Sequence, residues 1–154
     1  MRHLGTLDRA KLEEAARACA CANFRKASRA ITQFYDASLR PSGLRVTQYT
    51  PMAAVALMGS PTIAELAEKL VIDRTTLTRD LKVLEGRGLV EVRTGANDRR
   101  TRVAELTEAG RRTLAEAVPL WEQAQSAVVE GLGRQRWGSM LVDLSDAVTL
   151  VHGG

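Results

Sequence analysis

Hydrophobic residues recur at helical spacing along most of the chain, which predicts a mainly α-helical protein. From about Leu7 to Leu39 apolar and charged positions alternate as on one long helix or on two helices in tandem. The pattern stops at Arg40-Pro41-Ser42-Gly43, because proline and glycine interrupt helices and favour a turn. The first 39 residues are therefore expected to be helical up to this turn.

A second helix is expected from about Thr47 to Met58. The sequence allows two possible starts for this helix. Either Thr47 caps the helix, or Thr50 caps it and Pro51 occupies the first helical position, where proline is tolerated.

Two shorter helices follow, each opened by a capping residue. Thr62 and Glu65 have the spacing of a capping box. Asp73 is suited to cap a helix that runs to about Glu85, where Gly86 or Gly88 can end it in a left-handed conformation.

A β-hairpin and two more helices complete the pattern. Residues 89–93 and 101–106 are short β-prone runs joined by a segment rich in turn formers. Thr107 caps a further helix, in which Pro119 is expected to introduce a kink, and a last amphipathic helix begins near Leu132.

Composition favours one aliphatic core in a cytoplasmic protein. Only 4% of the 154 residues are aromatic, which favours helices packed through Ala and Leu over a β-sandwich. No apolar run is long enough to span a membrane, and the N-terminus is too charged for a secretory signal. Cys19 and Cys21 are too few and too close for a disulfide framework, as expected in a reducing compartment.

The net charge of +4 is concentrated in one window. Residues 74–102 hold eight basic and four acidic residues, whereas the rest of the chain is balanced at fourteen of each. A local basic patch is typical of a protein that binds a polyanion, although a plain solvated surface would have the same charge.

The helix after Asp73 has two distinct faces on a helical wheel. Leucines lie on one side, and short hydroxyls and long cations lie on the other. Arginine can bind guanine through two hydrogen bonds, threonine can meet a base edge or a phosphate, and lysine neutralises phosphate. We interpret this segment as a DNA recognition helix, and an ordinary surface helix is the alternative.

The hairpin tip is dense in arginine, and Asp98 lies close enough in sequence to hold the Arg100 guanidinium against it. An arginine at a narrow tip can enter the minor groove of DNA. Charges that deter pairing of the strand edge are the alternative explanation. The residues expected to contact DNA are Arg74, Thr75, Thr76, Thr78, Arg79 and Lys82 in the helix and Arg93, Asp98, Arg99 and Arg100 in the hairpin.

Several segments together resemble the MarR family of transcriptional regulators. The matching segments are Gly43-Leu44-Arg45-Val46-Thr47-Gln48, Ile63-Ala64-Glu65-Leu66-Ala67, Asp73-Arg74-Thr75-Thr76-Leu77-Thr78-Arg79, Leu84-Glu85-Gly86-Arg87-Gly88-Leu89-Val90, Asp98-Arg99-Arg100 and Leu106-Thr107-Glu108-Ala109-Gly110. The resemblance implies a winged helix-turn-helix fold, a second helix that starts near Thr47, and a homodimer that reads a palindrome in double-stranded DNA. It implies N-terminal dimerisation helices in residues 1–42, a DNA-binding domain in 43–106, and C-terminal helices completing the dimerisation region in 107–154.

The resemblance also implies a regulatory input, through a small anionic aromatic effector or a thiol-reactive agent. The candidate effector residues are Phe34, Tyr35, Tyr49, Met52 and Trp121, which could equally be ordinary core residues. The candidate thiol switch is Cys19 with Cys21. These cysteines diverge on an intact helix, but either could meet its symmetry mate or a thiophilic metal across a dimer; buried structural cysteine is the alternative.

An enzyme, a resident metal and a cofactor find no support in the sequence. The two histidines, His3 and His152, lie near the ends of the chain, and no phosphate loop or metal-ligand cluster is recognisable. A winged helix that binds protein instead of DNA is the main alternative, but it would need an apolar outer face on the recognition helix. The resemblance to the MarR family therefore implies a ligand- or thiol-responsive repressor.

Overall fold

The computed structural model describes residues 8–152, so Leu7 and His3 lie outside the described part. The described residues form seven α-helices, a 3-10 turn and one β-hairpin, in the order α1 (Arg9–Ala18), α2 (Ala20–Leu39), the 3-10 turn (Arg40–Ser42), α3 (Val46–Met58), α4 (Ile63–Leu70), α5 (Arg74–Gly86), β1 (Val90–Thr94), β2 (Arg102–Leu106), α6 (Glu108–Leu132) and α7 (Arg134–His152). This order confirms the predicted mainly α fold with a hairpin wing. The chain divides into two compact units, residues 1–34 and residues 35–154.

In the first unit, the N-terminal helical region is two helices in tandem. Cys19 ends α1 with an extended backbone (φ −60°, ψ 112°), and α2 begins at the next residue. The Asn23 side chain donates hydrogen bonds to the carbonyls of Arg17 and Cys19, at 3.0 and 2.9 Å. The bond to Arg17 reaches a carbonyl in the last turn of α1, where a helix leaves carbonyls without partners of its own, and the Cys19 carbonyl also accepts the Asn23 backbone N–H at 3.1 Å.

The second unit begins within α2, and its first turn fixes the start of α3. Gly43 adopts a left-handed conformation (φ 72°) after the 3-10 turn. The Asp36 carboxylate then accepts the Val46 N–H at 2.7 Å. The predicted start near Thr47 is confirmed, but neither threonine is the cap. The N-cap residue is Arg45, whose backbone N–H donates to the Gln48 side chain at 3.1 Å, and Asp36 of α2 accepts the N–H of the first helical residue. Pro51 lies buried inside α3.

The two predicted helix caps after α3 are confirmed. Thr62 and Glu65 form a reciprocal capping box at α4, and Asp73 accepts the Thr76 N–H at 2.8 Å at the start of α5. Between these helices Val71 has a left-handed backbone (φ 54°), which is uncommon for a β-branched residue. This turn sets the angle between α4 and α5.

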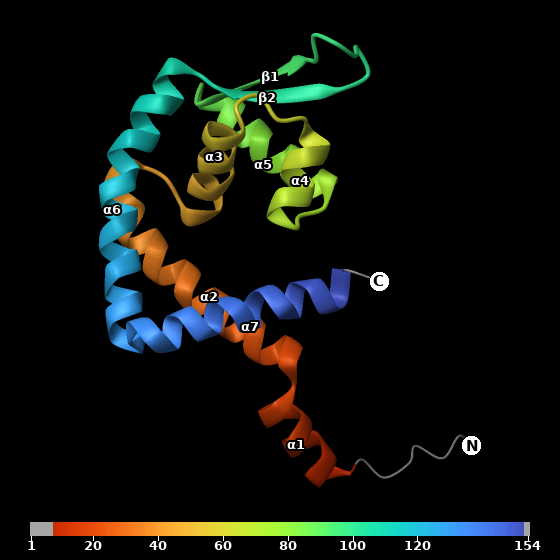
Figure 1. Ribbon diagram of the computed structural model, residues 1–154, viewed down its shortest axis with the longest axis vertical. Coiled ribbons are helices and arrows are strands. Elements are labelled where there is room, and N and C mark those ends of the chain that lie inside the picture. Colours follow the sequence, from red (N-terminus) through yellow and green to blue (C-terminus); the bar gives the residue numbers. More distant parts are fainter. Residues whose placement is uncertain (1–7, 153–154) are drawn as a thin grey trace, which may run out of the picture. The chain divides into compact units, whose positions relative to one another are not determined.

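β1 and β2 form an antiparallel hairpin in which Val92 lies opposite Ala104. The free edge of β2 is extended by the segment before α4, because the Ala104 N–H donates to the Pro61 carbonyl at 2.9 Å and Thr62 forms a bridge with Val103. Within the second unit, α3, α4 and α5 lie on one side of this hairpin and α6 runs beside α3 (Figure 1).

One hydrophobic core joins these elements. Its largest fully buried side chains are Leu39, Met52, Val55, Leu66, Leu77, Leu81 and Leu84. By contrast, α7 has no buried residue, and several of its apolar side chains are exposed. None of the helices in residues 8–152 is long and apolar enough to span a membrane.

The start of α6 packs closely against the end of the α5–β1 connection. Thr107 caps α6 by accepting the Gly110 N–H at 2.9 Å, and its hydroxyl donates to the Gly88 carbonyl at 2.6 Å. A Cβ atom at Gly110 would lie 1.9 Å from the Leu89 carbonyl oxygen, which is backbone and cannot rotate away. Glycine is therefore required here by contact.

We predict that Gly110→Ala lowers the free energy of unfolding by about 1–3 kcal/mol, because α6 must move away from Leu89. The matched control is Gly131→Ala in the same helix, where a new Cβ meets nothing within 4 Å. The control should be neutral or stabilising by about 0.5–1 kcal/mol. Urea unfolding followed by circular dichroism measures both variants, and equal stability of the two would contradict the packing argument.

Candidate nucleic-acid interface

α5 presents one polar face to solvent because its other face is held in the core. Leu77, Leu81 and Leu84 are each at most 1% exposed. The sequence predicted a polar outer face on α5, and the structure exposes its residues: Arg74, Thr75, Thr78, Arg79 and Lys82. The Thr78 hydroxyl donates to the Arg74 carbonyl at 2.7 Å, which leaves its oxygen lone pairs and methyl group for an external partner.

Thr76 is positioned differently from the other hydroxyl residues of α5. It is half-buried, and both its N–H and its hydroxyl donate to the Asp73 carboxylate. The hydroxyl bond and then the backbone bond from Thr76 lower the pKa of Asp73. The structure thus gives Thr76 a capping role, and its contact with DNA stays a prediction.

The hairpin tip is ordered by Asp98. Its carboxylate accepts the Arg100 backbone N–H at 2.8 Å, and its carbonyl accepts the Thr101 N–H and hydroxyl at 3.1 and 2.8 Å. The expected bond from Asp98 to the Arg100 guanidinium is not what the structure shows. Asp98 shapes the turn through the backbone, and the side chains of Arg99 and Arg100 project from it into solvent.

Arg93 lies near the turn end of β1, within reach of two carboxylates. Glu91 and Glu105 are directly opposite each other on the two strands, an arrangement in which like charges repel. Arg93 forms ion pairs with both, and the Ser60 hydroxyl donates to Glu105 at 2.7 Å. The hydrogen bond to Arg93 lowers the pKa of Glu91, and the same bond raises the pKa of Arg93. Arg93 therefore stabilises the wing, and its predicted DNA contact stays untested.

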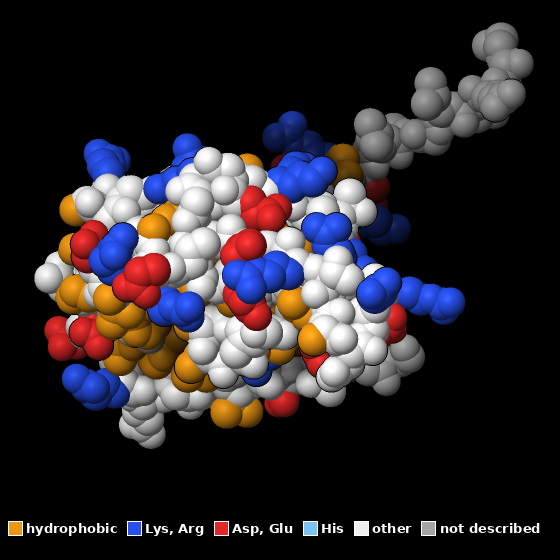
Figure 2. Space-filling view, turned by 90° about the horizontal axis from the view of Figure 1, so that it is seen from above, with side chains coloured by type: hydrophobic (Ala, Val, Ile, Leu, Met, Phe, Trp, Pro, Cys, Tyr) orange, Lys and Arg blue, Asp and Glu red, His pale blue; other side chains and the backbone are white. Residues whose placement is uncertain are grey.

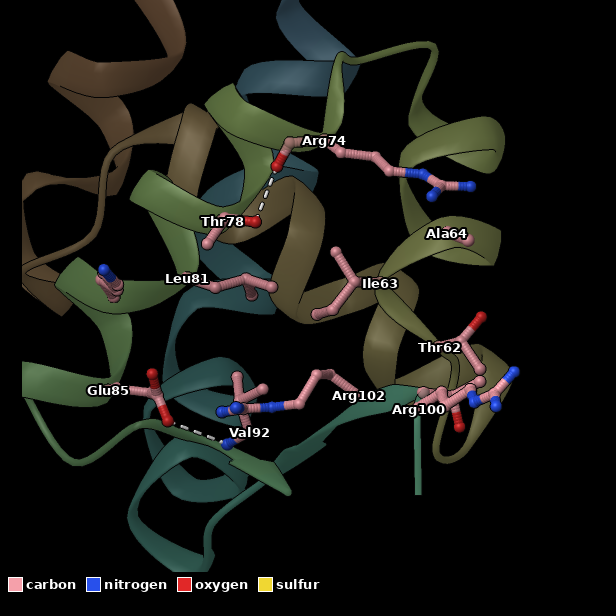
Figure 3. Close-up of a pocket in the computed structure, with 12 residues that line it drawn as sticks. Thr62, Ile63, Ala64, Arg74, Thr78, Leu81, Glu85, Val92, Arg100 and Arg102 are labelled. Carbon is pink, nitrogen blue, oxygen red and sulfur yellow. Dashed lines mark hydrogen bonds between the residues drawn. The ribbon is translucent and has the colours of Figure 1, made fainter. Parts of the chain in front are cut away.

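A cavity of about 430 Å³ is lined jointly by α5, the wing and the start of α4. Its charged lining is mostly basic, with Arg74, Lys82, Arg100 and Arg102 around a single acidic residue, Glu85. Figure 3 shows Arg100 on one side of this cavity and Glu85, bonded to Val92, on the other. The end of the molecule that carries the hairpin displays Lys and Arg side chains interspersed with Asp and Glu (Figure 2).

Sequence reasoning missed several contributors to this surface, among them Arg102, which lines the cavity but was not among the residues expected to contact DNA. Thr62 was predicted only as a helix cap, yet it also lines the cavity. Glu85 was predicted only as the approximate end of α5, and no sequence signal indicates that its carboxylate reaches the neighbouring strand. Both depend on how α4, α5 and the hairpin pack in three dimensions.

The candidate effector residues occupy several different environments. Met52 has no exposed surface and Tyr49 is 9% exposed, and both belong to the core, against which Trp121 packs. Tyr49 stacks on Trp121 with ring centroids 6.0 Å apart, and burial followed by the charge of Glu122 raises the pKa of Tyr49. The Tyr35 hydroxyl, whose pKa burial raises, donates to Gln125 of α6. Phe34 lies in the first unit and is exposed, so the effector site stays a prediction.

Cys19 and Cys21 are free and exposed, not buried. Cys19 is the residue at the break between α1 and α2, and Cys21 is the second residue of α2, so the two cysteines do not lie on one intact helix.

Comparison with known proteins identifies relatives over nearly the full length. The MarR family model matches residues 44–101. The DNA complex of the M. tuberculosis transcriptional regulator MosR is 41% identical with a TM-score of 0.77, covering 87% of this chain and 98% of that chain. The MosR structure described without DNA is 37% identical with a TM-score of 0.79, covering 91% and 100%. The transcriptional repressor CouR, bound to a 23-mer DNA duplex, is 26% identical with a TM-score of 0.76, covering 93% and 99%. No curated protein sequence matches significantly.

Proposed function

This chain belongs to the MarR family and is a DNA-binding transcriptional regulator, and from that premise we propose that it is a homodimeric repressor reading a palindromic operator. In this proposal residues 43–106 form the DNA-binding domain, and residues 1–42 and 107–154 form the dimerisation region. The observation that carries it is the exposed face of α5, which holds hydroxyls and cations and is fixed from behind by three buried leucines.

The two parts of the interface suit the two grooves of DNA. α5 has the width that the major groove admits, and Arg79 can bind guanine through two hydrogen bonds there. The wing tip is narrow, and its turn is shaped by Asp98, so Arg99 and Arg100 can approach the minor groove. Arg74 and Lys82 flank the cavity between these elements, where they can neutralise phosphates.

A homodimer is supported by apolar surface at both ends of the chain. In the first unit Leu12, Phe24 and Ile31 are 54%, 49% and 43% exposed. In the second unit Leu150 and Val151 of α7 are 83% and 74% exposed. Apolar side chains in such numbers are typical of surfaces that a partner covers. Two bound lobes related by twofold symmetry would meet symmetric half-sites.

A winged helix that binds protein is not favoured. The outer face of α5 lacks the large apolar side chains that such a contact needs, apart from Val83 at its edge, which is 50% exposed. MarR-family regulators are generally not enzymes, and we propose that this chain too acts without catalysis.

The regulatory input that we propose is thiol chemistry at Cys19 and Cys21. Both side chains are accessible to oxidants and thiophilic agents, and both lie where α1 and α2 meet. A change at this break would alter helices that we assign to the dimerisation region. A small anionic aromatic effector near Tyr35, Tyr49 and Trp121 remains the second candidate input.

The proposed function is tested by selecting bound fragments from genomic DNA and measuring fluorescence anisotropy on the selected duplex and a scrambled one over a salt series. We expect preference for the selected duplex with a steep salt dependence. Arg79→Ala should lose about 1–3 kcal/mol of this preference if Arg79 contacts a base. An equal loss on both duplexes would make Arg79 a phosphate contact, and no enrichment at all would contradict sequence-specific reading.

We predict that Arg100→Met weakens binding to the selected duplex by about tenfold, since one groove contact is worth roughly 1–3 kcal/mol. The dimer should stay intact in analytical ultracentrifugation. Arg93→Met is the matched control in the same wing. It should cost less affinity, because the Arg93 guanidinium already forms ion pairs with Glu91 and Glu105. Normal affinity of the Arg100 variant would remove the wing tip from the mechanism.

We predict that peroxide or an arsenic(III) compound weakens DNA binding by the wild-type protein and that a dithiol reductant restores it. The Cys19→Ser/Cys21→Ser double variant should bind DNA and be insensitive to both agents. Unchanged wild-type affinity after treatment would exclude the thiol switch.

A further inference from the structure

The free edge of β1 is held by a side chain of the recognition helix. The Thr107 N–H donates to the Leu89 carbonyl, and the Gly95 N–H donates to the Thr101 carbonyl. In an antiparallel pair every second residue is bonded to the other strand, so the odd-numbered residues from Leu89 to Gly95 face β2. The N–H of Val92 therefore points away from β2. It donates to a carboxylate oxygen of Glu85 at 3.0 Å, and both residues are half-buried.

The hairpin is thus fixed on both edges, but by different parts of the protein. On the β2 edge the Pro61 carbonyl accepts the Ala104 N–H, which ties the hairpin to the segment before α4. On the β1 edge the Val92 N–H donates to the Glu85 carboxylate, which ties the hairpin to α5. A change at Glu85 would leave the first attachment in place and release the second.

The negative charge of Glu85 is unfavourable for binding DNA, because it lies on a basic surface. Glu85 is the one acidic residue among the described residues that line the cavity, which Arg74, Lys82, Arg100 and Arg102 also line. A negative charge beside a DNA-binding surface repels phosphate, so its presence needs a compensating contribution. The bond to Val92 supplies one, because a charged acceptor makes a stronger hydrogen bond than a neutral one.

We propose that Glu85 is a positioning residue that sets the wing relative to α5, so that Arg100 and the face of α5 meet DNA together. This inference rests on the proposed function, since it assumes that both elements contact the same duplex. Its consequence is energetic coupling: the contribution of Arg100 to affinity depends on Glu85, although their side chains lie on opposite sides of the cavity (Figure 3).

The first test is amide hydrogen exchange of the wild-type protein, observed by NMR. The Val92 amide should exchange at least about tenfold more slowly than the Thr94 amide, whose N–H faces the same edge of β1. In Glu85→Met this protection should be lost at Val92, whereas the Arg93 amide within the hairpin stays protected. Glu85→Gln keeps an acceptor oxygen and should retain protection at Val92. Equal exchange of Val92 and Thr94 in the wild type would overturn the proposal.

The second test is a double-mutant cycle on the selected duplex. Arg100→Met should cost about tenfold in the wild type and in Glu85→Gln, but at most about threefold in Glu85→Met, because contacts that cooperate are not additive. Glu116→Met, an exposed charge removal on α6, should leave the cost of Arg100→Met unchanged. Equal costs in all backgrounds would overturn the role of Glu85 while leaving the wing in the mechanism. No cost of Arg100→Met even in the wild type would contradict the proposed function itself.

Discussion

The interface depends first on the burial of one face of α5. Leu77, Leu81 and Leu84 are almost fully removed from water, and each contributes on the order of 2 kcal/mol by its transfer into the core. This burial fixes the rotation of the helix about its own axis. Thr75, Arg79 and Lys82 then face outward whatever their own preferences, because the helical period leaves them no other side. A loss of packing behind α5 would therefore change DNA reading without any change in a DNA-facing residue.

Three of the four acidic residues within the basic window support the structure of the interface, whereas the fourth, Asp80, lies 3.9 Å from the Arg79 guanidinium. Asp98 accepts backbone N–H groups of the wing turn, Glu91 pairs with Arg93, and Glu85 accepts the N–H of Val92. Each carboxylate is thereby used for local structure, while Arg99 and Arg100 remain exposed. Positive charge at the wing tip thus stays accessible to a polyanion, while these three carboxylates stabilise local structure.

The sequence was sufficient where local chemistry decides the structure. The capping box of Thr62 and Glu65, the cap at Asp73 and the two-faced pattern of α5 were all predictable, because each depends on residues within one helix. The start of α3 was only partly predictable, since its N-cap is Arg45 and the N–H of its first residue is accepted by Asp36 from another helix. Two tandem helices were one of the two expectations for the N-terminal region, but the position of the break at Cys19 was not predicted, and neither was the hydrogen bond that Val92 donates to Glu85. The first depends on backbone torsions and the Asn23 side chain, and the second on the packing of a helix against a strand.

Replacement of single guanines by 7-deazaguanine in the selected duplex tests whether α5 reads base edges in the major groove. This change removes the N7 acceptor from the major groove and leaves the minor groove intact. We expect that at least one replacement weakens binding by the wild-type protein and has no further effect on binding by Arg79→Ala. Full wild-type affinity for every singly replaced duplex, or an equal loss in the variant, would contradict a guanine contact by Arg79.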